Sequence, residues 1–367
     1  MSSRPLVLAV DLDGSGAHPA AWRAGSDAPD AVLDPAVLRR RVLAAENGGF
    51  TLVTLDDALT TTQATVSSGA VAARLDGVVR AAFVSQLTTR VGLAPRVDPR
   101  GAEPFHLAAQ LASLDIASLG RAGWVVGDAD QPGLADAIDR VVPELPADRE
   151  LEVADVVRTV RRLWDSWEDD AVIKDVATGR YVDRDRIHDV AVTTPTFAVA
   201  GASITPRPPQ GHVVVIAPDT VLDPAAADVS LVGGADVAEV VERAVAARGA
   251  GAPRVLADVE VLLDADTSCA ARLAALDADA EWTPTDALRF VGSPFGLLLL
   301  AEQLAEAVDG IRLHPAVVGT DLPVLTRFVL PRLFATRIAR APRLAQTLRG
   351  ALDLPRPENV FTQEEAA

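Results

Sequence analysis

Short apolar runs alternate with longer amphipathic stretches along most of this 367-residue chain. Eight of these runs, each a few residues long and rich in Val and Leu, are interpreted as strands. They cover residues 6–12, 51–55, 91–95, 122–126, 213–217, 229–232, 255–263 and 310–314. Because most of the runs are continuously apolar, they are typical of parallel strands that are buried on both faces.

The stretches between these runs carry helix signals. Asp34-Pro35 predicts an N-cap followed by a proline at the first helical position, and Asn47-Gly48-Gly49 predicts the end of that helix. Ser293-Pro294 gives the same start signal before a helix over 295–308. Further helices are expected over 104–118, 151–167 and 321–333, and a basic helix over 337–349.

Eight strand–helix units in one chain of this length predict an α/β fold, a (βα)8 TIM barrel. A doubly wound open sheet is the alternative, and it normally has a glycine-rich turn after its first strand. Asp13-Gly14-Ser15-Gly16 is only a partial match to that turn. We therefore expect residues 1–367 to form a single TIM-barrel domain.

Two segments do not follow the strand–helix rhythm. Residues 168–211, between the fourth helix and the fifth strand, are polar and rich in turn residues, with a hairpin expected around 196–205. We expect this segment to be an insertion over the barrel mouth. Residues 335–367 are expected to form a C-terminal helix and a tail whose Pro-rich, acidic end frays.

Composition excludes some classes of function. A net charge of −17 argues against a nucleic-acid-binding surface, which needs a basic stripe. The single cysteine, Cys269, excludes an internal disulfide framework and a cysteine-rich metal site, and it fits a reducing cytoplasm. Residues 1–5 lead directly into a strand-like run instead of a signal peptide, and apolar runs such as 297–301 are far too short to span a membrane. We expect a cytoplasmic protein without nucleic-acid or membrane partners.

Candidate chemistry follows from the fold, because TIM-barrel enzymes place their sites at the carboxyl ends of the strands. Each candidate there also has a plain structural interpretation, such as a turn cap for Asp56 or a surface residue at a helix start for His106. No histidine pair has metal-ligand spacing and no serine lies in a GxSxG elbow, so metal and acyl-transfer chemistry lack support. The residues at or just after the expected strand ends are Asp11, Asp13, His18, Trp22, Asp56, Asp57, Arg96, Asp98, Glu103, His106, Trp124, Arg312 and His314.

Several motifs belong together. The most specific are Trp164-Asp165-Ser166-Trp167-Glu168 and Pro206-Arg207-Pro208-Pro209-Gln210-Gly211. A His-Pro-x-x-Trp-Arg turn at 18–23, Glu103-Pro104-Phe105-His106 and Gly120-Arg121-Ala122-Gly123-Trp124 accompany them. Through these motifs nearly the whole chain resembles the bacterial luciferase-like flavin-dependent monooxygenases, in the branch that includes nitrilotriacetate and dibenzothiophene-sulfone monooxygenases.

The resemblance implies an oxidoreductase that takes reduced FMN from a separate flavin reductase and uses O2 on a small organic substrate. Some relatives use the deazaflavin F420, which is a weaker possibility, and relatives are often dimers or tetramers, which implies a homo-oligomer. His106 is the candidate acid/base group, because imidazole titrates closest to neutral pH. Around a bound flavin we expect Asp56, Arg96 and Trp124, with Arg207 as part of a phosphate grip, and His18 and His314 near the substrate.

Departures from the family pattern keep a second hypothesis open. Val125 stands where the family has an Asn that touches the flavin ring, and Tyr181 is the only tyrosine in the chain. The family's Gly-Ser-rich turn, whose N–H groups hold the FMN phosphate, is replaced by residues 218–224, with two prolines and two aspartates. The alternative is therefore a family member that no longer binds flavin and serves as a binding or partner subunit.

Overall fold

A closed ring of parallel strands forms the centre of the computed structural model, which describes residues 4–24, 29–57, 73–127 and 146–362. The strands follow the order β10-β9-β4-β3-β2-β1-β13-β11, and pairing of β10 with β11 closes the ring. These strands match the eight predicted runs, so the TIM barrel is confirmed. Their bounds are β1 Val7–Asp11, β2 Leu52–Leu55, β3 Gly92–Val97, β4 Gly123–Val126, β9 Val214–Pro218, β10 Val229–Val232, β11 Val255–Leu263 and β13 Gly310–Pro315.

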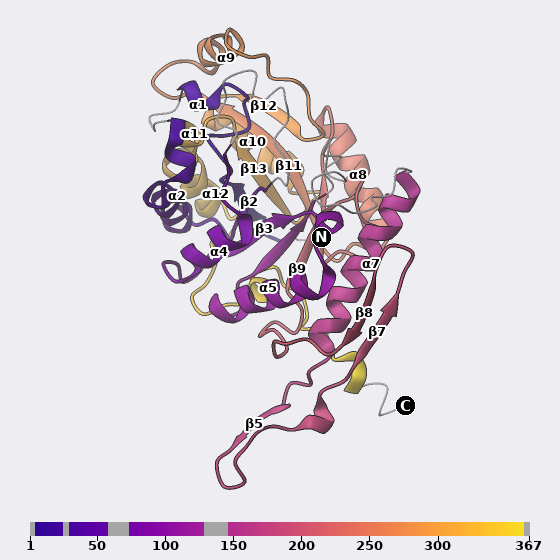
Figure 1. Cartoon of the computed structure of the whole chain (residues 1–367). Coiled ribbons are helices and arrows are strands. Elements are labelled where there is room, and N and C mark those ends of the chain that lie inside the picture. Colours follow the sequence, from indigo (N-terminus) through magenta and orange to yellow (C-terminus); the bar gives the residue numbers. More distant parts are fainter. Residues whose placement is uncertain (1–3, 25–28, 58–72, 128–145, 363–367) are drawn as a thin grey trace.

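Helices surround the ring, as Figure 1 shows. The side chain of Asp34 caps α2 by accepting from the Ala36 N–H, and Gly49 ends that helix at φ 98°. Ser293 caps α10 in the same way, so both predicted helix starts are confirmed. No helix within the described ranges is long and apolar enough to cross a membrane. The helices are α1 Ala21–Ala24, η1 Pro29–Leu33, α2 Pro35–Gly48, α4 Gly77–Ser85, η2 Pro99–Gly101, α5 Pro104–Ala117, α7 Pro146–Asp165, α8 Val237–Gly249, α9 Cys269–Asp277, α10 Pro294–Leu304, α11 Val318–Val324, η4 Leu325–Val329, α12 Leu330–Ala335 and α13 Leu348–Ala351.

One further strand, β12 (Leu288–Gly292), was not predicted. It pairs in parallel with the end of β11, outside the ring. Only Leu288 of this strand is fully buried, so its sequence lacks the continuous apolar run that marks the barrel strands.

The segment around α13, which follows β13, covers the barrel at the amino ends of its strands. Leu348 and Leu352 are about 1% exposed and pack among the side chains that fill the barrel interior. Gly92 makes room for this contact, because a Cβ at that position would lie 2.6 Å from Leu348 Cδ1. The basic helix predicted over 337–349 is therefore wrong: only α13 forms there, and the described tail is held by burial instead of fraying.

The segment at 168–211 forms two antiparallel hairpins, one of β5 (Val172–Asp175) and β6 (Arg180–Val182), the other of β7 (Val190–Thr193) and β8 (Ala198–Gly201). A short helix, η3 (Arg184–Arg186), lies between them. The hairpin expected around 196–205 is thus shifted toward the amino end.

The position of this segment differs from the expected one. The hairpins follow the C-terminal end of α7, and because α7 runs back along the barrel, that end lies at the amino ends of the strands. Gln210 contacts Asp115 and the Ala122 carbonyl just before β4. Figure 1 accordingly shows β5 and α9, which follows the carboxyl end of β11, at opposite ends of the molecule. The insertion does not lie over the barrel mouth.

We predict that Leu348→Ala lowers the free energy of unfolding by about 2–5 kcal/mol, because it leaves a cavity at the sealed base of the barrel. Leu344→Ala is the matched control, since Leu344 is 70% exposed, and it is expected to change stability by less than about 0.5 kcal/mol. Urea unfolding of both variants measures the difference. Equal effects would contradict the proposed seal.

Candidate active site

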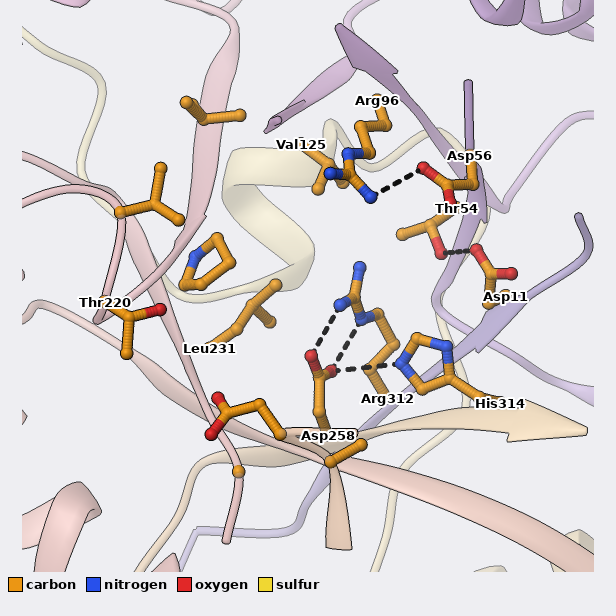
Figure 2. A pocket seen from close by; sticks show the side chains of 16 residues that line it. Asp11, Thr54, Asp56, Arg96, Val125, Thr220, Leu231, Asp258, Arg312 and His314 are labelled. Atoms are coloured by element: carbon orange, nitrogen blue, oxygen red, sulfur yellow. Dashed lines mark hydrogen bonds and ion pairs between the residues drawn. The ribbon is translucent and has the colours of Figure 1, made fainter. Parts of the chain in front are cut away.

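A cavity of about 310 Å³ opens at the carboxyl ends of the barrel strands. Figure 2 shows its lining, with Thr220 and Leu231 on one side and Asp11, Thr54 and Asp56 on the other. Its size is at the lower end of ordinary ligand pockets. The residues around it are Asp11, Thr54, Asp56, Arg96, Val125, Val126, Pro218, Thr220, Val221, Leu231, Gly233, Asp258, Asp286, Ala287, Arg312 and His314.

The most strongly bonded group in the cavity is Asp258 with its two basic neighbours from β13. Parallel pairing of β11 and β13 places Asp258 opposite Arg312. Arg312 Nη2 and Nε lie 2.5 and 2.6 Å from the two oxygens of Asp258, and His314 Nε2 lies 3.4 Å from Oδ1. Burial would raise the pKa of Asp258, but Arg312 and His314 together hold that pKa well below its usual range. The cavity therefore holds a carboxylate that is ionised at neutral pH, beside an imidazole.

A second polar group comes from the first three strands. Arg96 Nη1 donates to Asp56 Oδ1 at 3.1 Å, and the Thr54 hydroxyl donates to Asp11 Oδ1 at 2.6 Å. Both side chains of the Asp56–Arg96 pair are about one-third exposed, so the pair faces the cavity. Asp56, Arg96 and His314 are thus predicted residues that the structure brings together. Their roles toward a cofactor or substrate stay predictions.

Asp258 was missed in the sequence, although a signal was present. It is a charged residue inside the nine-residue apolar strand β11. Leu256, two positions earlier, points into the barrel interior, so side-chain alternation places Asp258 on the same inner side.

His18 lies outside this cavity. Its ring nitrogens bond to Asp277 Oδ1 and to the Ala20 N–H, both at 3.1 Å, and it packs against Trp282. Burial lowers the pKa of His18, partly offset by Asp277. His18 and Asp13 line a separate cavity of about 450 Å³, so the structure does not bring His18 and His314 to one site.

Trp124 and His106 also lie away from the cavity lining. Trp124 is fully buried between the barrel and its helices, and its indole N–H donates to the Val97 carbonyl at 3.0 Å. Its neighbour Val125 points inward and lines the cavity. His106 is exposed near the start of α5. The expected contact of Trp124 with a cofactor is therefore not supported by its position.

Arg207 joins the two most specific motifs at the opposite end of the barrel. Its side chain, 2% exposed, lies 2.8 Å from Asp165 and 3.1 Å from Asp169. It also donates to the Pro357 carbonyl in the tail. Arg207 therefore connects α7, the insertion and the tail, and its position does not support the expected phosphate grip.

The chain belongs to the luciferase-like monooxygenase family, whose sequence model matches residues 17–309. This match confirms the resemblance seen in the motifs.

Individual relatives cover less of the sequence. N-acetyl-S-(2-succino)cysteine monooxygenase from Bacillus subtilis (strain 168) is 31% identical over 58% of this chain and 48% of its own length. The chain spans about half the length of most of the curated relatives it matches.

Solved structures extend the likeness in fold to nearly the whole chain. DmoA from Hyphomicrobium sulfonivorans superposes with a TM-score of 0.84 at 18% identity, over 99% of this chain and 96% of that one. A riboflavin lyase structure with modified FMN and riboflavin has a TM-score of 0.80 at 23% identity, over 95% of this chain and 96% of that one.

We predict that Arg207→Met lowers the free energy of unfolding by about 3–5 kcal/mol, because it leaves Asp165 buried without its cation. Arg356→Met is the control: it removes another partner of Asp169, but this pair is half exposed and is expected to contribute about 0–1 kcal/mol. Thermal or urea unfolding checks both values. An Arg207→Met variant that is as stable as the unchanged protein but no longer binds flavin would instead support the expected role of Arg207 in holding the flavin phosphate.

Proposed function

We propose that this chain is a flavin-dependent monooxygenase that oxidises a small organic substrate with reduced flavin and O2. The observation that carries the proposal is the cavity at the carboxyl ends of the strands of a luciferase-like barrel. One part of its wall is apolar, and two clusters of charged side chains, one around Asp258 and one around Asp56, form the rest.

The cavity suits part of a flavin. Val125 and Leu231 offer alkyl surface for a flat ring system, and Arg96 offers guanidinium donors beside it. When bound, a reduced flavin supplies the electrons for oxygen chemistry, while the protein binds and orients it. The terminal phosphate of FMN has no comparable fit at the exits of β9 and β10, where the charged side chains are already paired.

His314 is the side chain we propose for moving a proton to or from the substrate. Its Nε2 lies 3.4 Å from the Asp258 carboxylate, which faces the imidazole across the cavity wall and orients it. Arg312 keeps Asp258 ionised, so it acts as a positioning residue. His106, the candidate from sequence, stays a competing prediction.

The separate flavin reductase rests on the family resemblance, and F420 is a weaker alternative to a flavin. The homo-oligomeric state and the cytoplasmic location also stay predictions.

Anaerobic titration of the full chain with reduced flavin tests the proposal. We expect saturable binding in the micromolar range or tighter, and substrate-dependent O2 consumption once a flavin reductase is added. Binding of no flavin up to about 1 mM, weaker than roughly −4 kcal/mol, would contradict the proposal and favour the partner-subunit alternative.

We predict that His314→Asn lowers kcat by about 10²- to 10⁴-fold, because the proton-transfer group is lost, while the Kd for reduced flavin changes little. His106→Asn is measured beside it, and a comparable loss there with full activity in His314→Asn would transfer the role to His106. His188→Asn is the control for histidine replacement, since His188 pairs with Glu168 in the insertion at the other end of the barrel.

A further inference from the structure

The turn that follows β9 has little capacity to bind a phosphate through its backbone. The N–H groups of Asp219, Val221 and Leu222 already donate to carbonyls of β10 and of the end of β9, at 3.0–3.2 Å. Pro218 and Pro224 have no N–H to offer. A phosphate placed here would meet a backbone whose described donors are largely committed.

The exit of β10 is closed in a similar way. The Gly234 N–H donates to the Asp286 carbonyl at 2.7 Å, and a Cβ on Gly233 would collide with that same oxygen. The amino end of α8 is capped by carboxylates: Glu239 accepts from the Ala235 N–H at 2.8 Å, and Asp236 accepts from the Glu239 N–H at 3.0 Å. Two carboxylates therefore already lie at this helix start, and their negative charge disfavours a bound anion there.

Arg243 of α8, whose side chain lies at these exits, is fully engaged. Arg243 lies 2.5 and 3.1 Å from the oxygens of Asp219, and 2.6 and 2.9 Å from those of Asp286. The hydrogen bonds that Arg243 donates to Asp286 and Asp219 raise the pKa of Arg243 further above its usual value. One guanidinium between two carboxylates leaves a net charge of −1, which repels a phosphate dianion.

Thr220 lines the cavity between these groups. Its hydroxyl can exchange hydrogen bonds with the neutral hydroxyls of a ribityl chain. The described part of this side of the cavity therefore matches a flavin with an uncharged polyol tail better than one with a terminal phosphate.

We propose that the cavity selects a flavin without the terminal phosphate, so that reduced riboflavin binds more tightly than reduced FMN. This inference rests on the proposed flavin-dependent function. We expect a preference on the order of tenfold, which corresponds to about 1.4 kcal/mol. Repulsion of this size is typical of like charges near about 4 Å at a protein surface.

The test is a set of anaerobic titrations of the full chain with reduced riboflavin, reduced FMN and reduced lumiflavin, which has the ring alone. We expect Kd for riboflavin about tenfold below that for FMN, and a gap that narrows at high salt because the repulsion is screened. FMN binding as tightly as riboflavin, or tighter, would overturn the inference while leaving the flavin-dependent function intact. If none of the three binds, the flavin-dependent function fails together with this inference.

Replacing one carboxylate tests the cause of the selection. Asp219→Asn keeps an oxygen for Arg243 but removes a charge, and it is expected to shift the riboflavin-to-FMN preference toward FMN several-fold. Glu302→Gln on the exposed side of α10 makes the same charge change elsewhere and should leave the ratio unchanged. Should Asp219→Asn fail to fold, Asp286→Asn replaces it, since that carboxylate is 61% exposed at the cavity rim. An unchanged ratio in the folded Asp219→Asn or Asp286→Asn variant would contradict the inference.

Discussion

Alternation of side chains in a closed parallel barrel is the constraint on which the site depends. Every second residue of each strand points into the barrel. Because the ring is closed, its register is fixed, and so is the set of residues that point inward. Arg312 and His314 therefore share the inner side of β13, and Asp258 meets Arg312 because the two strands are in register. The same rule sends Trp124 outward and Val125 inward. A one-residue shift would replace the charged lining with an apolar one.

The barrel itself was accessible from the sequence because its signals are local. Apolar runs mark strands that are buried on both faces, and Asp34-Pro35 or Ser293-Pro294 carry their capping chemistry within a few residues. The tail and the insertion were not accessible in this way. α13 is buried only because Gly92 and Gly123 leave space beneath it, and these residues lie more than two hundred positions away along the chain.

The candidate site was partly accessible for the same reason. Residues at strand ends, such as Asp56, Arg96 and His314, could be placed once the barrel was assumed. Arg207 could not, since its partner Asp165 lies 42 positions earlier and only the folded chain joins them. The most specific sequence motifs thus mark the contact between α7, the insertion and the tail. The residues that line the cavity do not belong to these two motifs.

The seal at the base of the barrel also governs how the molecule can assemble. β1 pairs with β13, the last strand in the described part of the chain, and Leu348 and Leu352, which follow β13, close the interior. Both contacts join residues that are separated by some three hundred positions. Bringing such distant residues together costs conformational entropy, which is recovered only when these contacts have formed, late in folding. During synthesis, the ribosome must release residues 348–352 before the interior can be shielded from water. An amino-terminal fragment that ends before residue 348 would leave the apolar side chains at the base of the barrel exposed to water, which makes arrested or truncated chains prone to aggregation.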